Sequence, residues 1–153
     1  MISSNNNDGF FMEKAIEEAQ RSLKNSEVPV GAVIAKNDKI IAKAYNRIET
    51  ENDATAHAEI LAIRKAGRKT GNWRLSDSTL YVTVEPCAMC LTAIHLARIK
   101  KIVFGCASFN KMYTNRSLKK PELVQIPDIT IQEKCSKMMK DFFKKARNAR
   151  RIK

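Results

Sequence analysis

The chain has 153 residues and a mass of 17.3 kDa, and 44% of its residues are hydrophobic, which suits one domain with a buried core. This composition excludes a collagen, a mucin-like chain and a disordered tail. The formal net charge of +12 favours a phosphate-bearing partner or an anionic membrane surface, although a lysine-rich surface without a specific partner would give the same balance.

The N-terminal segment contains neither a basic region nor a long apolar run, which is unlike a secretory signal. No later segment approaches the length of a membrane span. We therefore expect a cytoplasmic protein that has no membrane partner. Four Cys residues are few for a disulfide scaffold and suit a reducing compartment, where paired thiols more often bind metal.

The first third of the chain predicts a helix followed by a hairpin. Asp8 can cap a helix that runs to Leu23, because apolar residues recur there at helical spacing. Two apolar runs, residues 30–35 and 39–45, are separated by a short polar turn, which is typical of an antiparallel hairpin.

The middle of the chain alternates between helix and strand. A polar stretch, residues 47–53, leads into a helix that starts close to His57 and can stop at Gly67 or Gly71. Pro86 suits the first turn of a helix, where its missing N–H has no partner to lose. The other elements predicted here are a strand over 79–84, a helix over 87–98 and a strand over 101–105.

The last third combines a polar segment with a basic helix. Residues 106–126 are mostly polar, Ile129 to Ile131 could form a fifth short strand, and residues 134–153 form an amphipathic helix that is dense in Lys and Arg. The order of elements predicts an α/β domain in which helical crossovers make the later strands parallel. We find no repeat and no boundary, so we expect a single domain over residues 1–153.

Two short motifs at predicted helix starts carry the chemistry: His57-Ala58-Glu59 and Pro86-Cys87-Ala88-Met89-Cys90. Cys87 and Cys90 point to one side of the first helical turn, where the helix dipole favours thiolates. Two thiolates and an imidazole select zinc, and three protein ligands leave a fourth position open for water, as in catalytic sites. The sequence thus predicts a zinc site at His57, Cys87 and Cys90.

Glu59 lies two residues from His57 and need not bind the metal. Its carboxylate can hold a proton taken from a zinc-activated water, which makes Glu59 a candidate general acid and base. Each motif alone is weak, because structural zinc sites and redox pairs also use Cys-x-x-Cys. The combined pattern is that of zinc nucleobase deaminases.

The sequence resembles the bacterial tRNA-specific adenosine deaminases of the cytidine deaminase-like superfamily, from about Met12 to Gly105. The segments that carry the resemblance are Glu27-Val28-Pro29-Val30-Gly31-Ala32-Val33, Tyr45-Asn46-Arg47, Asp53-Ala54-Thr55-Ala56-His57-Ala58-Glu59-Ile60 and Asn72-Trp73-Arg74-Leu75, followed by Leu80 to Cys90.

This resemblance implies a three-layer α/β/α fold with a mixed five-stranded sheet. It also implies one zinc ion per subunit, a proton shuttle at Glu59, and hydrolytic deamination of adenosine to inosine at the wobble position (34) of a tRNA anticodon. The enzyme is then a homodimer that binds the tRNA anticodon arm. No nucleotide cofactor is expected, because the chain has no glycine-rich phosphate loop.

Substrate contacts are likewise implied by the resemblance. Asn46 would hydrogen-bond the extruded base, the backbone N–H of Ala58 would line the pocket, and Pro29 and Val30 would lie near its mouth. Taken alone, Asn46 at a strand end is more typical of a turn residue. Lys111 would contact nucleotides beside the target.

The segment after Gly105 departs from the family pattern. Ser108 stands where the family usually has an acidic residue, which leaves the choice of RNA open. The basic C-terminal helix is either a contact for the anticodon arm or a solvated face.

Two other functions fit parts of the pattern. A zinc deaminase of a free base or nucleoside, of the guanine or cytidine type, would share the fold and the site but would not need the positive charge. A non-catalytic structural-zinc RNA-binding protein would need Cys106, Cys135 or His95 as the fourth zinc ligand. Otherwise Cys106 and Cys135 are expected to be small buried hydrophobes.

Overall fold

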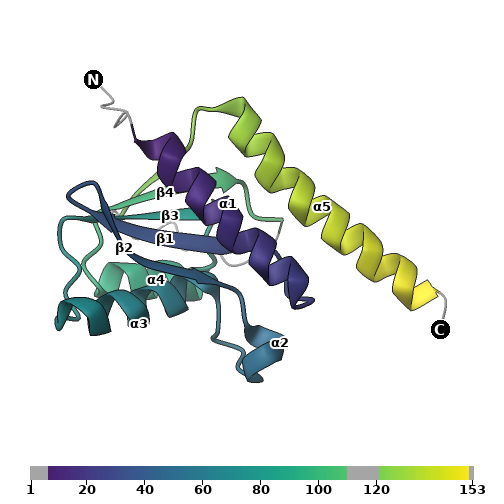
Figure 1. Ribbon diagram of the computed structural model, residues 1–153, viewed down its shortest axis with the longest axis horizontal. Coiled ribbons are helices and arrows are strands. Elements are labelled where there is room, and N and C mark those ends of the chain that lie inside the picture. Colours follow the sequence, from purple (N-terminus) through teal and green to yellow (C-terminus); the bar gives the residue numbers. More distant parts are fainter. Residues whose placement is uncertain (1–6, 110–120, 152–153) are drawn as a thin grey trace.

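The computed structural model describes residues 7–109 and 121–151 (Figure 1). In chain order its elements are α1 (Asp8–Lys24), β1 (Gly31–Lys36), β2 (Lys39–Tyr45), α2 (Ile48–Glu51), α3 (Ala58–Thr70), β3 (Ser78–Val84), α4 (Ala88–Leu96), β4 (Lys101–Cys106), β5 (Glu122–Gln125) and α5 (Ile129–Arg151).

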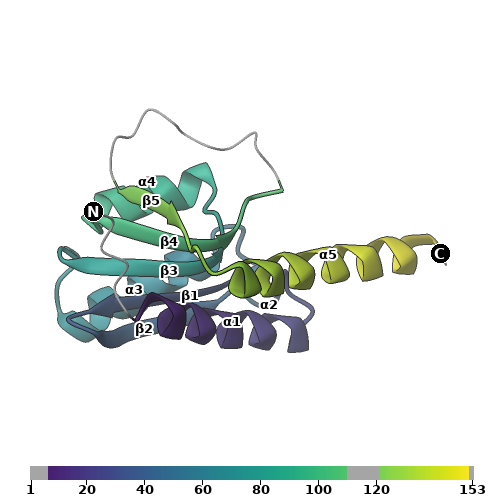
Figure 2. The ribbon, with the colours of Figure 1, turned by 90° about the horizontal axis from the view of Figure 1, so that it is seen from above.

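The strands form one mixed sheet in the order β2-β1-β3-β4-β5. Strand β1 is antiparallel to both β2 and β3, whereas β3, β4 and β5 are parallel. Helices α1 and α5 pack on one face of the sheet and α3 and α4 lie on the other (Figures 1 and 2). The three-layer α/β/α fold with parallel later strands is therefore confirmed.

Local sequence explains where the elements around the hairpin and α3 end. Asn37 and Asp38 both have positive φ, 50° and 57°, which is the conformation that a tight two-residue hairpin turn requires. Helix α3 ends at Gly71, whose φ of 65° places it in the left-handed region that glycine adopts at helix C-termini. Both of these boundaries agree with the prediction.

Gly31 lets α1 lie unusually close to the sheet. A Cβ atom at this position would overlap the carbonyl oxygen of Ala15 and crowd the backbone of Ala19. The N–H of Gly31 donates to Thr83 Oγ1 at 3.2 Å. Helix α1 is thereby fixed against β1 and β3, and the residues just before β1 and just after β3 line the site described below.

The predicted strand over 129–131 is wrong. Ile129–Arg151 is one helix, and the fifth strand is Glu122–Gln125, which pairs with β4. Asp128 explains the error, because its Oδ1 accepts a hydrogen bond from the N–H of Ile131 at 3.2 Å and so caps a helix that begins before 134.

Two smaller expectations about the N-terminal half also need correction. Asp8 does not cap α1. Its carboxylate instead accepts hydrogen bonds from Tyr81 Oη at 2.7 Å and Lys101 Nζ at 3.4 Å, which ties the helix to the sheet. The polar stretch after Asn46 contains the four-residue helix α2, which has no apolar spacing to reveal it.

No helix among residues 7–109 and 121–151 has the length and apolar character needed to cross a membrane.

Candidate active site

Three predicted ligands meet at the N-terminal ends of α3 and α4. His57 and Cys87 are the extended residues that directly precede these helices, and Cys90 lies in the first turn of α4. Strand β3 delivers Cys87 to the carboxyl edge of the sheet through Glu85 and Pro86. Parallel strands followed by helices place side chains at this edge, which is why residues 30 positions apart converge.

The geometry of the three ligands fits tetrahedral zinc. His57 Nδ1 lies 3.8 Å from Cys87 Sγ and 3.6 Å from Cys90 Sγ, and the three ligand atoms are all within 4.8 Å of one another. Zn–S bonds of about 2.3 Å and Zn–N bonds of about 2.0 Å at a tetrahedral angle imply S···N separations of about 3.6 Å. The donor set and its spacing therefore match a zinc centre.

No fourth His, Cys, Asp or Glu joins this group within the part of the chain that the structure describes. Cys106 and Cys135 are free, buried thiols outside the cluster, as expected for small hydrophobic residues. A closed structural site with one of these cysteines or His95 as fourth ligand is thus not formed by the described residues. An open fourth position is characteristic of catalytic zinc.

Hydrogen bonds among the three candidate ligands shift their pKa values and favour a thiolate at Cys87. A hydrogen bond with Cys90 lowers the pKa of Cys87 to about 4, so Cys87 is a thiolate at neutral pH. The same hydrogen bond, together with burial, raises the pKa of Cys90. A hydrogen bond with Cys87 raises the pKa of His57. A thiolate is the form of cysteine that binds metal.

Glu59 lies in the first turn of α3 and is 4% exposed. Its Oε2 atom is buried and has no hydrogen-bond partner among the described residues. Burial raises the pKa of this carboxyl group. An unpaired buried carboxylate oxygen is costly, and in a cavity beside three metal ligands it is the kind of group that a reaction uses.

A cavity of about 220 Å³ opens beside the ligands. The residues that line it are Val28, Val30, Asn46, Ile48, His57, Glu59, Val84, Glu85, Cys87 and Ser108. Ser108 donates its backbone N–H to Glu85 Oε2 at 3.2 Å. The residue that replaces the expected acidic side chain therefore lies at the wall of the cavity.

Asn46 is buried at the end of β2, and its side chain is fixed by α3. Its Oδ1 atom accepts the backbone N–H of Ala58 at 2.8 Å, so the side chain presents its amide NH2 group as a donor. Val30 lines the cavity, whereas Pro29 and Ala58 are buried and are not among its lining residues. Lys111 lies outside the described residues.

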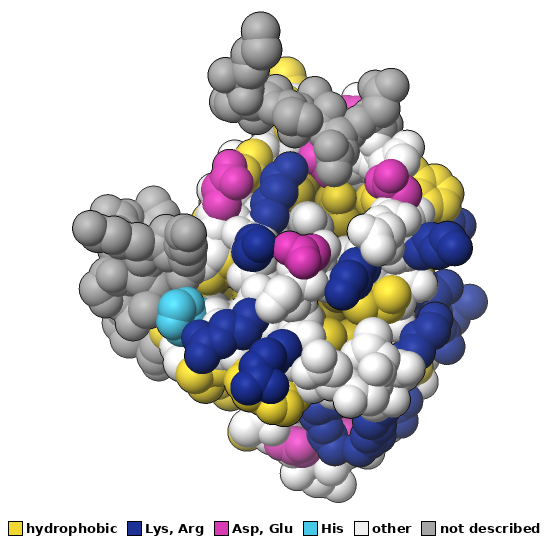
Figure 3. All heavy atoms as spheres, turned by 90° about the vertical axis from the view of Figure 1, so that its left-hand side faces the viewer, with side chains coloured by type: hydrophobic (Ala, Val, Ile, Leu, Met, Phe, Trp, Pro, Cys, Tyr) yellow, Lys and Arg dark blue, Asp and Glu magenta, His cyan; other side chains and the backbone are white. Residues whose placement is uncertain are grey.

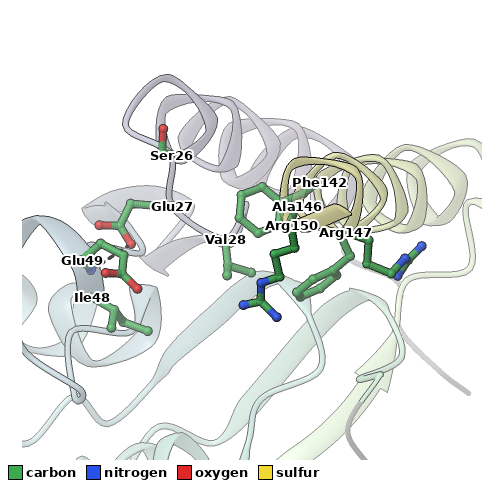
Figure 4. A pocket seen from close by; sticks show the side chains of 10 residues that line it. Ser26, Glu27, Val28, Ile48, Glu49, Phe142, Ala146, Arg147 and Arg150 are labelled. Carbon is green, nitrogen blue, oxygen red and sulfur yellow. Dashed lines mark hydrogen bonds between the residues drawn. The ribbon is translucent and has the colours of Figure 1, made fainter. Parts of the chain in front are cut away.

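A second cavity of about 360 Å³ adjoins the first and separates the body from α5 (Figure 4). Figure 4 shows Glu27, Ile48 and Glu49 on one side, Phe142, Arg147 and Arg150 on the other, and Val28 between them. Val28 and Ile48 line both cavities. We call this second cavity the α5 cleft.

The sequence motifs did not single out Ile48, and Glu27 and Glu85 lie within the segments that resemble the family but had no role assigned to them. Ile48 is a single apolar residue in a polar stretch, and Glu85 is an ordinary charged residue before a proline. The available signal was their position beside motif residues, since Glu85 and Glu27 directly precede Pro86 and the Val28-Pro29-Val30 segment.

Comparison with known families places these residues in context. The family described as "Cytidine and deoxycytidylate deaminase zinc-binding region" matches residues 5–106. The chain is 41% identical over 148 residues to the tRNA-specific adenosine deaminase of Buchnera aphidicola subsp. Schizaphis graminum, covering 93% of this chain and 97% of that protein.

Solved structures agree with this relationship. One belongs to a study of A-to-I editing by tRNA:A34 deaminases at the wobble position of transfer RNA. It superposes with a TM-score of 0.76 at 33% identity and covers 85% of this chain and 99% of that one. A guanine deaminase from Bacillus subtilis gives a TM-score of 0.62 at 42% identity, but covers only 65% of this chain and 64% of its own.

Proposed function

Because the chain belongs to the tRNA-specific adenosine deaminases of the zinc-binding cytidine and deoxycytidylate deaminase family, we propose that it converts adenosine to inosine at wobble position 34 of a tRNA anticodon. The observation that carries this function is the unpaired Glu59 Oε2 in a cavity beside a three-ligand zinc site. The net reaction is adenosine plus water giving inosine plus ammonia.

His57, Cys87 and Cys90 would hold the metal. Zinc in such a site lowers the pKa of water toward about 7, which supplies a nucleophile at neutral pH. Glu59, whose Oε2 has no hydrogen-bond partner among the described residues, would take up a proton at this atom and pass it to the ring nitrogen of the base. A second transfer through the same oxygen releases the amino group as ammonia.

Binding of the base is assigned to the walls of the cavity. Because the Asn46 oxygen already accepts the Ala58 N–H, Asn46 would face the base with its NH2 group, a donor that suits a ring nitrogen acceptor of the purine. Val30 supplies an apolar wall, and Pro29 fixes the segment that carries it. Lys111 remains a prediction for contact with a flanking nucleotide.

Helix α5 is proposed to contact the phosphates of the anticodon arm. The last buried residue of α5 is Met139. The second half of the helix projects beyond the sheet (Figures 1 and 2) and forms one side of the α5 cleft. Arg147 and Arg150 line that cleft, which adjoins the catalytic cavity. An anticodon loop suits the site because its bases are already unpaired and can be extruded at low cost.

The wider assembly is also a proposal. Helix α4 is apolar on nearly every side, yet Met89 and Leu96 are 37% and 59% exposed, which favours a homodimer that covers this helix. The single five-stranded sheet, with helices on both of its faces, favours one domain over residues 1–153. Four free cysteines, two of them metal ligands, suit the cytoplasm.

The similarity to a guanine deaminase makes a free-base substrate the second candidate. The deciding assay offers the zinc-loaded protein an anticodon stem-loop with adenosine at the wobble position and, separately, adenosine, cytidine and guanine. We expect inosine in the stem-loop and little turnover of the free compounds. Turnover confined to a free compound would reject the tRNA function.

A further inference from the structure

Glu27 is a buried carboxylate that the proposed reaction does not use. It is 1% exposed and lies just after α1, where its backbone N–H donates to the carbonyl oxygen of Ser22 at 3.0 Å. A carboxylate buried to this extent is costly unless hydrogen bonds replace its lost hydration. Its partners therefore indicate what it does.

Among residues 7–109 and 121–151, every hydrogen bond of the Glu27 carboxylate is with α2. Oε1 accepts from the Thr50 N–H at 2.7 Å and from Thr50 Oγ1 at 2.9 Å, and Oε2 accepts from the Glu49 N–H at 3.3 Å. Charge-assisted bonds of this kind are stronger than bonds between neutral groups. Glu27 thus joins the end of α1 to a helix more than 20 residues further along the chain.

Apart from Glu27, the described contacts of α2 are local: Arg47 pairs with Glu51 at 3.0 Å, and the Arg47 N–H donates to the carbonyl oxygen of Ala56 at 3.0 Å. None of its four residues is buried, and Arg47, which precedes it, makes no capping hydrogen bond with its side chain. Among the described residues, Glu27 is the only side chain outside residues 46–57 that bonds α2. A helix this short is not stable by itself, so its position depends on the Glu27 contacts.

The position of α2 matters because Ile48 lines both the catalytic cavity and the α5 cleft. We propose that Glu27 is a positioning residue that fixes α2 and thereby holds Ile48 as the wall between these two spaces. Without this tether, α2 would be mobile in the free protein, and ordering it when the substrate binds would reduce the binding free energy. The candidate metal ligands and Glu59 lie at the N-terminal ends of α3 and α4 and keep their places.

The kinetic test rests on the proposed function and uses the full-length, zinc-loaded protein with the anticodon stem-loop. We expect Glu27→Ala and Glu27→Leu to raise KM about tenfold while kcat stays within about threefold, because they impair binding rather than chemistry. Glu27→Gln should have a smaller effect, since its oxygen can still accept both bonds from Thr50. Thr50→Val, which removes only the hydroxyl bond, should also be mild.

Glu17→Gln is the matched control, because Glu17 is an exposed carboxylate of α1 that pairs only with Lys14. It should leave KM and kcat unchanged. An unchanged KM in Glu27→Ala, or a fall in kcat and zinc content without a change in KM, would overturn the positioning role.

Amide hydrogen exchange tests the tether without any assay of activity. In Glu27→Ala, the amides of Glu49 and Thr50 should exchange faster while those of α3 and α4 are unchanged. Unchanged exchange at these two amides would refute the tether. If the wild-type protein proves inactive on RNA but the two amides respond, the tether stands and the proposed function fails.

Discussion

Glu59 and the three candidate metal ligands differ in their surroundings in a way that suits the separate roles proposed for them. His57, Cys87 and Cys90 converge within 4.8 Å, whereas the nearby Glu59 keeps one oxygen without a partner. A carboxylate that bound the metal could not also move protons freely. Leaving Glu59 outside the ligand set is therefore what suits it to proton transfer.

Replacing Glu59 by Gln or Ala should keep zinc bound and abolish turnover. We expect kcat to fall about a thousandfold, which is within the range that a general acid–base group contributes. Metal analysis of the purified variants and single-turnover assays with the stem-loop check both parts. A variant with kcat within tenfold of the wild-type value would remove Glu59 from the mechanism.

The sequence predicted these four residues because each motif is local and the residue types themselves are chemically distinctive. It could not predict the role of Glu27, whose partners Glu49 and Thr50 lie 22 and 23 positions away. Contacts of that kind depend on the packing of α1 against β1. The Asn46 to Ala58 bond was hidden for the same reason, because a turn residue and a cavity residue look alike in a sequence.

At the scale of elements, the contact between α1 and β1 depends on the absence of a side chain at Gly31. Gly31→Ala should lower the free energy of unfolding by about 3 kcal/mol, since the added methyl group meets backbone of α1 that cannot move aside. Denaturant unfolding of the zinc-loaded protein measures this loss.

Gly67→Ala is the control for this prediction. Gly67 lies within α3, and an added Cβ there would come no nearer than 3.8 Å to its neighbours. We expect it to be neutral or to stabilise by about 0.5 kcal/mol, because alanine favours helix. If both variants had the same free energy of unfolding, the close contact between α1 and Gly31 would not contribute to stability as proposed.

Most element types followed from apolar periodicity, and two of the exceptions share a cause. Helix α5 begins earlier than predicted because Asp128 caps it, and Asp8 bonds Tyr81 and Lys101 rather than its own helix. An aspartate before an apolar run can do either. Only the tertiary surroundings decide, and they are not visible in a local window.

For the whole molecule, the net charge of +12 is not confined to α5. Figure 3 shows Lys and Arg side chains spread over the end of the molecule that lies away from the C-terminus of α5. A positive charge spread this widely attracts RNA from a distance. Direct contacts with the phosphates beside the target base require cations near the catalytic cavity. Arg147 and Arg150 meet that condition because they line the α5 cleft.

The double variant Arg147→Gln, Arg150→Gln should weaken binding of the stem-loop and reduce the slope of log K against log salt by roughly 1 to 2. The control is Lys134→Gln, Lys137→Gln, which removes the same charge from residues already paired with Glu13 and Asp141. Binding titrations from 50 to 200 mM salt compare the two. If the two double variants weakened binding equally, the cationic side chains of α5 would be a solvated surface and not an RNA contact.

The metal ligands also have a consequence for the folded state. His57 and Cys87 lie 30 positions apart in the chain and on two different helices, so an ion bound to both closes a loop that the unfolded chain leaves open. Metal binding is then part of the folding free energy. Removal of zinc with a chelator is therefore expected to lower the free energy of unfolding as well as to abolish the proposed activity.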